Sequence, residues 1–178
     1  MNTTSATATT TVWAIDPTHS EISFKVKHMM ISTVRGHFDT FSATLESEDE
    51  TFDHVKAEVV IQTDSINTKN PDRDGHLKSD DFFNAEAFPE IRFESTHFTG
   101  TELTGKLTIR DVTKEITLSV TNNGVAVDPY GQTKVGFELS GEISRKEFGL
   151  KWNAVTEAGS IVVSDQVQLI IDAQFIRQ

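Results

Sequence analysis

The chain has 178 residues, a length that suits a single domain. It contains no Cys, which excludes structural disulfides, thiolate metal sites and cysteine nucleophiles. Its formal net charge of −11 opposes contact with nucleic-acid phosphates and with anionic lipid headgroups. The composition therefore argues against nucleic-acid binding and against a polybasic membrane anchor.

Residues 1–11 are rich in Thr and Ala and lack the basic and apolar segments of a secretory signal. We expect a disordered lead here, followed by a single domain over residues 12–178. The sequence as written predicts a cytoplasmic protein, or a periplasmic one if it is a trimmed precursor. Every apolar stretch is far shorter than the roughly 20 residues that cross a bilayer as a helix, so no stable membrane insertion is expected.

Apolar and polar residues alternate with a period of two along most of the remaining chain. This pattern is typical of an antiparallel sheet with one face in water. Turn residues are predicted at 16–17, 123–124 and 128–131. The strands are predicted over residues 12–15, 20–28, 36–47, 57–62, 91–94, 103–109, 116–120, 135–143 and 167–175. Roughly eight strands of this kind predict an all-β barrel or sandwich.

The alternation stops between residues 65 and 89, where residues 72–83 predict one short helix in a long connection. Long connections in a compact domain often carry function. Here the spacing of oxygen-bearing side chains resembles a calcium loop. The residues in question are Asn70, Asp72, Asp74, Gly75, Leu77 and Asp81. A calcium-binding module is therefore one alternative, and acidic residues that cap a helix N-terminus are the other.

Motifs for catalysis are missing from the sequence. The six His do not have the spacing that places two imidazoles on one metal, so no metal ligands are predicted. There is no GxSxG nucleophile motif and no glycine-rich loop that would hold a phosphate. We therefore expect a protein that is not an enzyme and that uses no cofactor.

The inward faces of the predicted strands carry almost no charge, and the chain has twelve Phe against one Tyr. An eight-stranded barrel encloses either packed side chains or one small ligand. The alternation does not distinguish a filled barrel from a hollow one. A filled barrel that acts as a stress-related interaction module is therefore an alternative to a barrel that holds a ligand.

Several segments together resemble the YceI-like family of lipocalin-like barrels. They are WAIDPTHS at 13–20, GHFD at 36–39, DSINT at 64–68, RDGHLKSDDFF at 73–83, PEIRFEST at 89–96, GKLTIR at 105–110 and RKEFG at 145–149. The resemblance implies an eight-stranded antiparallel lipocalin-like barrel with an internal pore. It further implies binding, transport or storage of a long apolar lipid, such as a polyisoprenoid, an isoprenoid quinone or a fatty-acyl compound. Family members often form homodimers.

The strand phases and this resemblance together give a set of predicted lipid-contacting residues. The set is Phe24, Val26, Phe38, Phe82, Phe83, Phe93, Leu107, Ile109, Leu118, Phe137, Leu139, Phe148, Leu169 and Ile171. A lipid headgroup would favour a polar or cationic side chain near the pore mouth. The candidates for that contact are His28, Arg35, Arg73 and Arg145.

Overall fold

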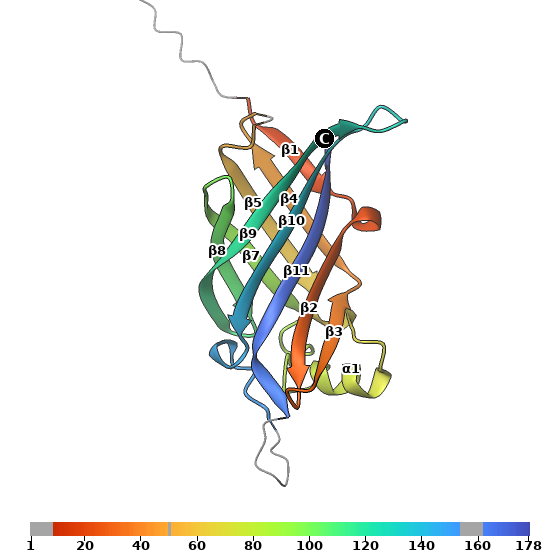
Figure 1. Cartoon of the computed structure of the whole chain (residues 1–178), viewed down its shortest axis with the longest axis vertical. Helices are drawn as coiled ribbons and strands as arrows, with labels where there is room; N and C mark the ends of the chain where they lie inside the picture. The colour runs from red at the N-terminus through yellow and green to blue at the C-terminus, as the bar shows by residue number, and fades with distance from the viewer. Residues whose placement is uncertain (1–8, 50, 154–161) are drawn as a thin grey trace, which may run out of the picture.

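The structure is a computed structural model that describes residues 9–49, 51–153 and 162–178. Most of the predicted lead over residues 1–11 lies outside these ranges, and Thr11 already belongs to the first strand. The described chain forms a tall barrel of tilted strands, with one helix beside its lower end (Figure 1). No helix among the described residues is long and apolar enough to cross a membrane.

The described residues form eleven strand segments, one α-helix and three short 3-10 helices. The strands are β1 (Thr11–Ile15), β2 (Glu21–His28), β3 (Ser32–Phe38), β4 (Phe41–Ser47), β5 (Val55–Gln62), β6 (Ile66–Asn67), β7 (Glu90–Phe98), β8 (Glu102–Ile109), β9 (Val112–Val127), β10 (Thr133–Ser144) and β11 (Val163–Arg177). The helices are η1 (Pro17–His19), η2 (Thr63–Ser65), α1 (Pro71–Lys78) and η3 (Lys146–Phe148).

These segments form a closed antiparallel barrel of eight strands, as the sequence predicted. The ring runs β1-β4-β5-β7-β8-β9-β10-β11, and β1 closes it by pairing with β11. The strands β2, β3 and β6 prolong β1, β4 and β5 toward the lower end, because β2 also pairs with β11 and β3 pairs with β2 and β6. The strand predicted over 36–47 is therefore two strands, separated by a break at residues 39–40.

The turn predicted at residues 123–124 is wrong, because both residues lie inside the long strand β9. Gly124 has a φ of +98° and pairs with Gly136, whereas Phe137 pairs with Asn122. The extra residue, Asn123, is a β-bulge. Asn-Gly suits this backbone as well as it suits a hairpin turn, so its dipeptide signal is ambiguous.

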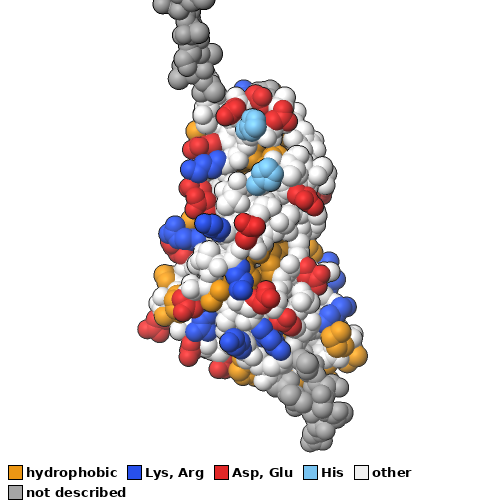
Figure 2. Space-filling view, turned by 90° about the vertical axis from the view of Figure 1, so that its left-hand side faces the viewer, with side chains coloured by type: hydrophobic (Ala, Val, Ile, Leu, Met, Phe, Trp, Pro, Cys, Tyr) orange, Lys and Arg blue, Asp and Glu red, His pale blue; other side chains and the backbone are white. Residues whose placement is uncertain are grey.

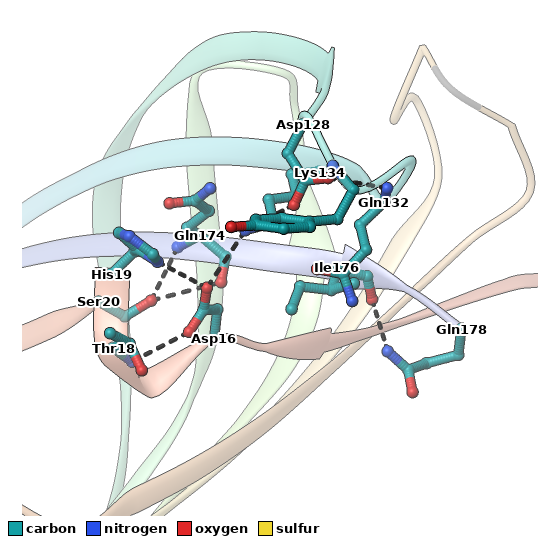
Figure 3. A network of polar contacts seen from close by, with 11 residues as sticks. Asp16, Thr18, His19, Ser20, Asp128, Gln132, Lys134, Gln174, Ile176 and Gln178 are labelled. Carbon is teal, nitrogen blue, oxygen red and sulfur yellow. Dashed lines mark hydrogen bonds and ion pairs between the residues drawn. The ribbon is translucent and has the colours of Figure 1, made fainter.

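A polar network fixes the corner between β1 and β2 (Figure 3). Asp16 is only 8% exposed, and its carboxylate accepts bonds from the Thr18 N–H at 3.0 Å and from the His19 ring at 2.7 Å. Lys134 of β10 lies between this carboxylate, at 3.5 Å, and that of Asp128, at 3.3 Å. The network therefore joins the barrel's first corner to the β9–β10 hairpin.

This corner predicts an acid-sensitive contribution to stability. The bond from His19, with further help from Thr18 and Lys134, lowers the pKa of Asp16 below its ordinary value of 3.8. Because the pKa of Asp16 is lower in the folded state than in the unfolded state, its ionised carboxylate stabilises the fold at pH values above the unfolded-state pKa. This contribution is lost as the pH falls through the folded-state pKa. We expect Asp16→Ala to destabilise the protein by about 1–2 kcal/mol near neutral pH. In urea unfolding, the difference in unfolding free energy between this variant and wild type should shrink below pH 4. A difference that does not change with pH would show that the Asp16 carboxylate does not stabilise the fold through its charge.

Candidate functional site

A cavity of about 250 Å³ occupies the interior of the barrel. Most of its wall is made of inward-facing side chains from the strands, and Leu77 of α1, Phe82, Phe83, Arg145 and Leu150 complete it. Ser23 and Arg145 are its only polar members among the described residues, and the Ser23 hydroxyl donates to the Ile170 carbonyl. The outer surface is polar by contrast, with apolar side chains confined to small patches on the face in Figure 2. The barrel is therefore hollow and lined with hydrocarbon.

The structure places every predicted pore residue except one on this wall. The residues found there are Phe24, Val26, Phe38, Phe82, Phe83, Phe93, Leu107, Ile109, Leu118, Phe137, Leu139, Leu169 and Ile171. Their contact with a lipid stays a prediction. Phe148 is the exception: it is 1% exposed and packs in the core from η3. Gly149, with φ of +83°, turns the chain after it, and Leu150 takes a place on the wall instead.

Other wall residues were not in the predicted set, although the same alternation marks most of them. The strand residues among them include Ile15, Ile22, Leu45, Val59, Ile61, Ile91, Leu103, Ile116, Ile143, Val167 and Phe175. Leu77 carried no comparable signal, because it lies on a short helix whose contact with the barrel depends on the tertiary fold.

Aromatic rings seal the upper end of the cavity. Trp13 and Phe52 are 0% and 1% exposed, with ring centroids 5.4 Å apart. Phe52 also packs edge-on against Phe137 at 5.5 Å, and the Trp13 indole N–H donates to the Ser47 hydroxyl at 3.0 Å. Phe52 has a φ of +58°, which is rare for a bulky residue. This end is therefore closed to a ligand.

The lower end has a different construction, in which α1 and the segment after it complete the wall together with the paired strands β2, β3 and β6. Leu77, Phe82 and Phe83 come from this region and line the cavity. The Arg110 guanidinium holds the segment by donating to the Asp80 and Phe82 carbonyls at 3.0 and 2.9 Å. His76 of α1 packs edge-on against Trp152 with centroids 4.8 Å apart. This part of the lower wall thus depends on side-chain contacts, whereas β2, β3 and β11 are joined by strand ladders.

Two glycines give opposite predictions for the same substitution. A Cβ at Gly105 of β8 would overlap the Phe93 ring and the Glu94 carbonyl, so Gly105→Ala should cost about 1–3 kcal/mol. A Cβ at Gly75 of α1 meets nothing within 4 Å, so Gly75→Ala should stabilise the protein by about 0.5–1 kcal/mol. Urea unfolding of both variants measures whether each change lowers or raises the free energy of unfolding. A neutral Gly105→Ala would show that the Phe93 ring moves freely.

Arg145 lies on the cavity wall but is only 3% exposed. Its Nε donates to the Ser164 carbonyl at 2.9 Å, and Nη2 donates to the Val163 carbonyl at 3.2 Å. Its Nη1 donates to the carbonyls of Leu150 and Trp152 at 2.6 and 2.8 Å. Burial lowers the pKa of this guanidinium, and the nearby Asp165 carboxylate opposes the shift. The structure thus gives Arg145 a role in holding the ends of the β10–β11 connection.

The other three headgroup candidates lie elsewhere, and none lines the cavity. Arg73 is bound to its own neighbourhood, since its Nε donates to the Thr68 hydroxyl and its Nη2 to the Thr68 carbonyl, both at 2.8 Å. Arg35 is exposed on β3, and His28 is half-buried at the end of β2. A role for any of them in headgroup binding stays a prediction.

The residues with calcium-loop spacing form helix α1 and its caps. The Asn70 side chain caps the helix by accepting from the Arg73 N–H at 3.1 Å. Asp74 accepts from the Thr68 N–H and hydroxyl, and Asp81 bonds to the His76 ring at 2.8 Å. Among the described residues, no group of three His, Cys, Asp or Glu side chains could hold a metal ion. The geometry thus matches the helix-capping interpretation.

A closed antiparallel barrel with an enclosed apolar cavity is the architecture of lipocalin-like binding proteins. The model of the YceI-like domain family matches residues 13–175, and the chain belongs to this family. A curated relative, UPF0312 protein SAB2563 of Staphylococcus aureus, is 38% identical over 93% of this chain and 97% of its own length.

Solved structures of the same fold agree with this assignment. The Campylobacter jejuni YCEI protein is 34% identical, has a TM-score of 0.72, and the match covers 86% of this chain and 91% of that one. Burkholderia cenocepacia BcnA has a TM-score of 0.76 at 23% identity, and the match covers 90% of this chain and 98% of that one. A polyisoprenoid binding domain from Saccharophagus degradans has a TM-score of 0.71 at 15% identity, and the match covers 93% of this chain and 98% of that one. The last two likenesses show the fold alone.

Proposed function

We propose that this protein binds one long apolar lipid inside its barrel and performs no chemistry on it. The observation that carries the proposal is the cavity itself, which is enclosed by strands and lined almost entirely by hydrocarbon side chains. Polyisoprenoids, isoprenoid quinones and fatty-acyl compounds are the ligand classes with matching chemistry. The Saccharophagus degradans domain is described as polyisoprenoid-binding and has the same fold, which supports this choice.

The driving force would be the transfer of hydrocarbon out of water, about 0.8 kcal/mol for each buried CH₂ group. An engineered apolar cavity of about 150 Å³ stays dry and binds benzene, so the larger cavity of about 250 Å³ here offers a ready site for an alkyl or prenyl chain. Apolar contacts discriminate poorly between chains that differ by a few carbons. The protein should therefore accept a range of chain lengths.

The polar end of the ligand would lie at the lower end, because aromatic rings seal the upper one. Arg145, the cation of the wall, already donates to four backbone carbonyls. A neutral or weakly polar headgroup is therefore the better match. Such a protein would serve as a carrier or a store for its lipid, as a monomer or as the homodimer expected from the family resemblance.

Mass spectrometry of organic extracts from the natively purified protein tests the proposal. We expect a long-chain prenyl or acyl species in a fixed molar ratio to the protein. Protein purified through detergent should take up added geranylgeraniol, which native mass spectrometry would detect. A clean extract together with no uptake would overturn the proposal and favour the ligand-free interaction module.

A further inference from the structure

The tip of the β2–β3 hairpin presents three consecutive apolar side chains to solvent. Met29, Met30 and Ile31 are 39%, 70% and 81% exposed. The Met29 N–H donates to the Val162 carbonyl at 2.7 Å, which joins the tip to the residue before β11, and the Ile31 N–H donates to the His28 carbonyl at 3.2 Å, which closes the turn. The apolar groups are thus held outward at a fixed position.

The backbone at this tip is an unfavourable one for the residues that occupy it. Met29 and Met30 have φ values of +52° and +59°, in the left-handed region that Asn and Gly adopt most easily. A hairpin selected only for stability would place Asn-Gly here. The apolar side chains are therefore not explained by the needs of the turn.

The strands that carry the tip are basic, although the whole protein has a net charge of −11. Lys25, Lys27 and Arg35 are the charged residues between positions 22 and 38, and there is no Asp or Glu in that range. Lys25 lies directly opposite Arg35 on β3 and opposite Gln168 on β11, so like charges face each other without an acidic neighbour in the register. Such a pair is destabilising by itself and becomes favourable next to an anionic surface.

The tip also lies at the end of the barrel where a lipid would enter. Val26 and Val163 line the cavity, and Val163 pairs with His28, the residue that precedes Met29. The hairpin, α1 and the start of β11 all lie at the lower end in Figure 1, opposite the sealed end. Most of the Lys and Arg side chains on the face in Figure 2 lie in its lower half, where Asp and Glu side chains lie among them.

We propose that the Met29–Met30–Ile31 tip inserts into the surface of an anionic lipid bilayer, with Lys25, Lys27 and Arg35 against the headgroups. An apolar tip flanked by basic residues is the combination that binds reversibly in the bilayer interface. Docking there would place the lower end of the cavity at the membrane, where a long apolar lipid can pass between bilayer and barrel without crossing water. This role for the hairpin rests on the proposed lipid-binding function.

Vesicle co-sedimentation of the full chain tests the docking. The probes are vesicles of phosphatidylglycerol and phosphatidylcholine, compared with phosphatidylcholine alone. The variant Met29→Asn/Met30→Gly/Ile31→Ser removes the apolar groups and relaxes the turn, so it should fold at least as well as wild type. The matched control is Val127→Ser/Tyr130→Ser, which removes side chains that are 67% and 90% exposed at the opposite hairpin.

We expect wild type and control to bind the anionic vesicles in a salt-sensitive manner, and the tip variant to bind at least about tenfold more weakly. Lys25→Gln/Arg35→Gln should weaken binding and reduce its dependence on salt. Absence of wild-type binding, equal binding by the tip variant, or equal binding to both vesicle types would overturn the proposal. So would a tip variant that changes the sedimentation of the protein without vesicles, since the tip would then join two copies.

Uptake of geranylgeraniol from detergent micelles separates this proposal from the function on which it rests. The tip variant should take up the lipid from micelles as wild type does, but should accept it more slowly from anionic vesicles. Failure of micelle uptake by wild type would contradict the lipid-binding function and leave vesicle docking to be judged by sedimentation. Normal micelle uptake with no vesicle binding would contradict the docking alone.

Discussion

Leu139→Asp is expected to abolish lipid uptake while the barrel still folds. Leu139 lies in the middle of β10 and its side chain faces the cavity. A carboxylate there would have to lose its hydration when an apolar chain enters, which costs several kcal/mol. Uptake of geranylgeraniol at neutral pH should fall at least about a hundredfold. Native mass spectrometry measures the uptake, and circular dichroism checks that the barrel has formed.

The pH dependence of this variant gives a second readout. An apolar environment raises the pKa of a carboxyl group, because burial disfavours the charged form. The introduced group should therefore become neutral as the pH falls, and uptake should recover in part. Ser140→Asp is the matched control, since Ser140 is the next residue, is exposed and faces away from the cavity. Equal uptake by the two variants would show that the inward face of β10 is not the ligand site.

Arg145→Ala is expected to have the largest effect on stability of any change considered. It removes the donors of four backbone carbonyls in a region where the side chain is 3% exposed. Unpaired buried polar groups cost about 1–3 kcal/mol each before relaxation. Since the carbonyls near the surface can regain water, we expect a net loss of about 3–5 kcal/mol in the free energy of unfolding. Urea unfolding measures this loss.

A control variant shows whether the effect comes from the buried contacts or from a lost positive charge. Arg35→Ala removes an exposed Arg and should change the unfolding free energy by no more than about 0.5 kcal/mol. Arg145→Lys keeps the charge but provides three donors in a different geometry, so most of the loss should remain. If Arg145→Ala were fully stable but deficient in lipid uptake, the headgroup interpretation of Arg145 would be right and the structural one wrong.

Most of the fold and much of the cavity wall could be predicted from the sequence. Alternation over 103–109 and 135–143 gives the strands β8 and β10 and also their inward faces, because side chains of a strand point to opposite sides in turn. Leu107, Ile109 and Leu139 lie on the cavity wall for this reason, and their contact with a lipid stays a prediction. The two Phe after α1 were found through the family resemblance, since no periodicity marks residues 79–89.

Local signals failed where two backbone geometries use the same residues. The Asn123-Gly124 pair suits a turn and a bulge equally, and the presence of β10 alongside decides between them. Phe148 has the apolar side chain of a wall residue, but η3 and the turn at Gly149 direct it into the core. The role of Arg145 was missed because no local pattern shows that its guanidinium meets the carbonyls of Val163 and Ser164, which lie at the start of β11, 18 and 19 residues further along the chain.

The sequence by itself determined which side chains face the interior, because that follows from the two-residue period of a strand. Only the tertiary structure decided that the interior is hollow. Whether opposite side chains meet depends on the barrel's diameter, on the Trp13 and Phe52 rings that close one end, and on the packing of α1 at the other. These are distances between residues far apart in the chain, and no local pattern encodes them.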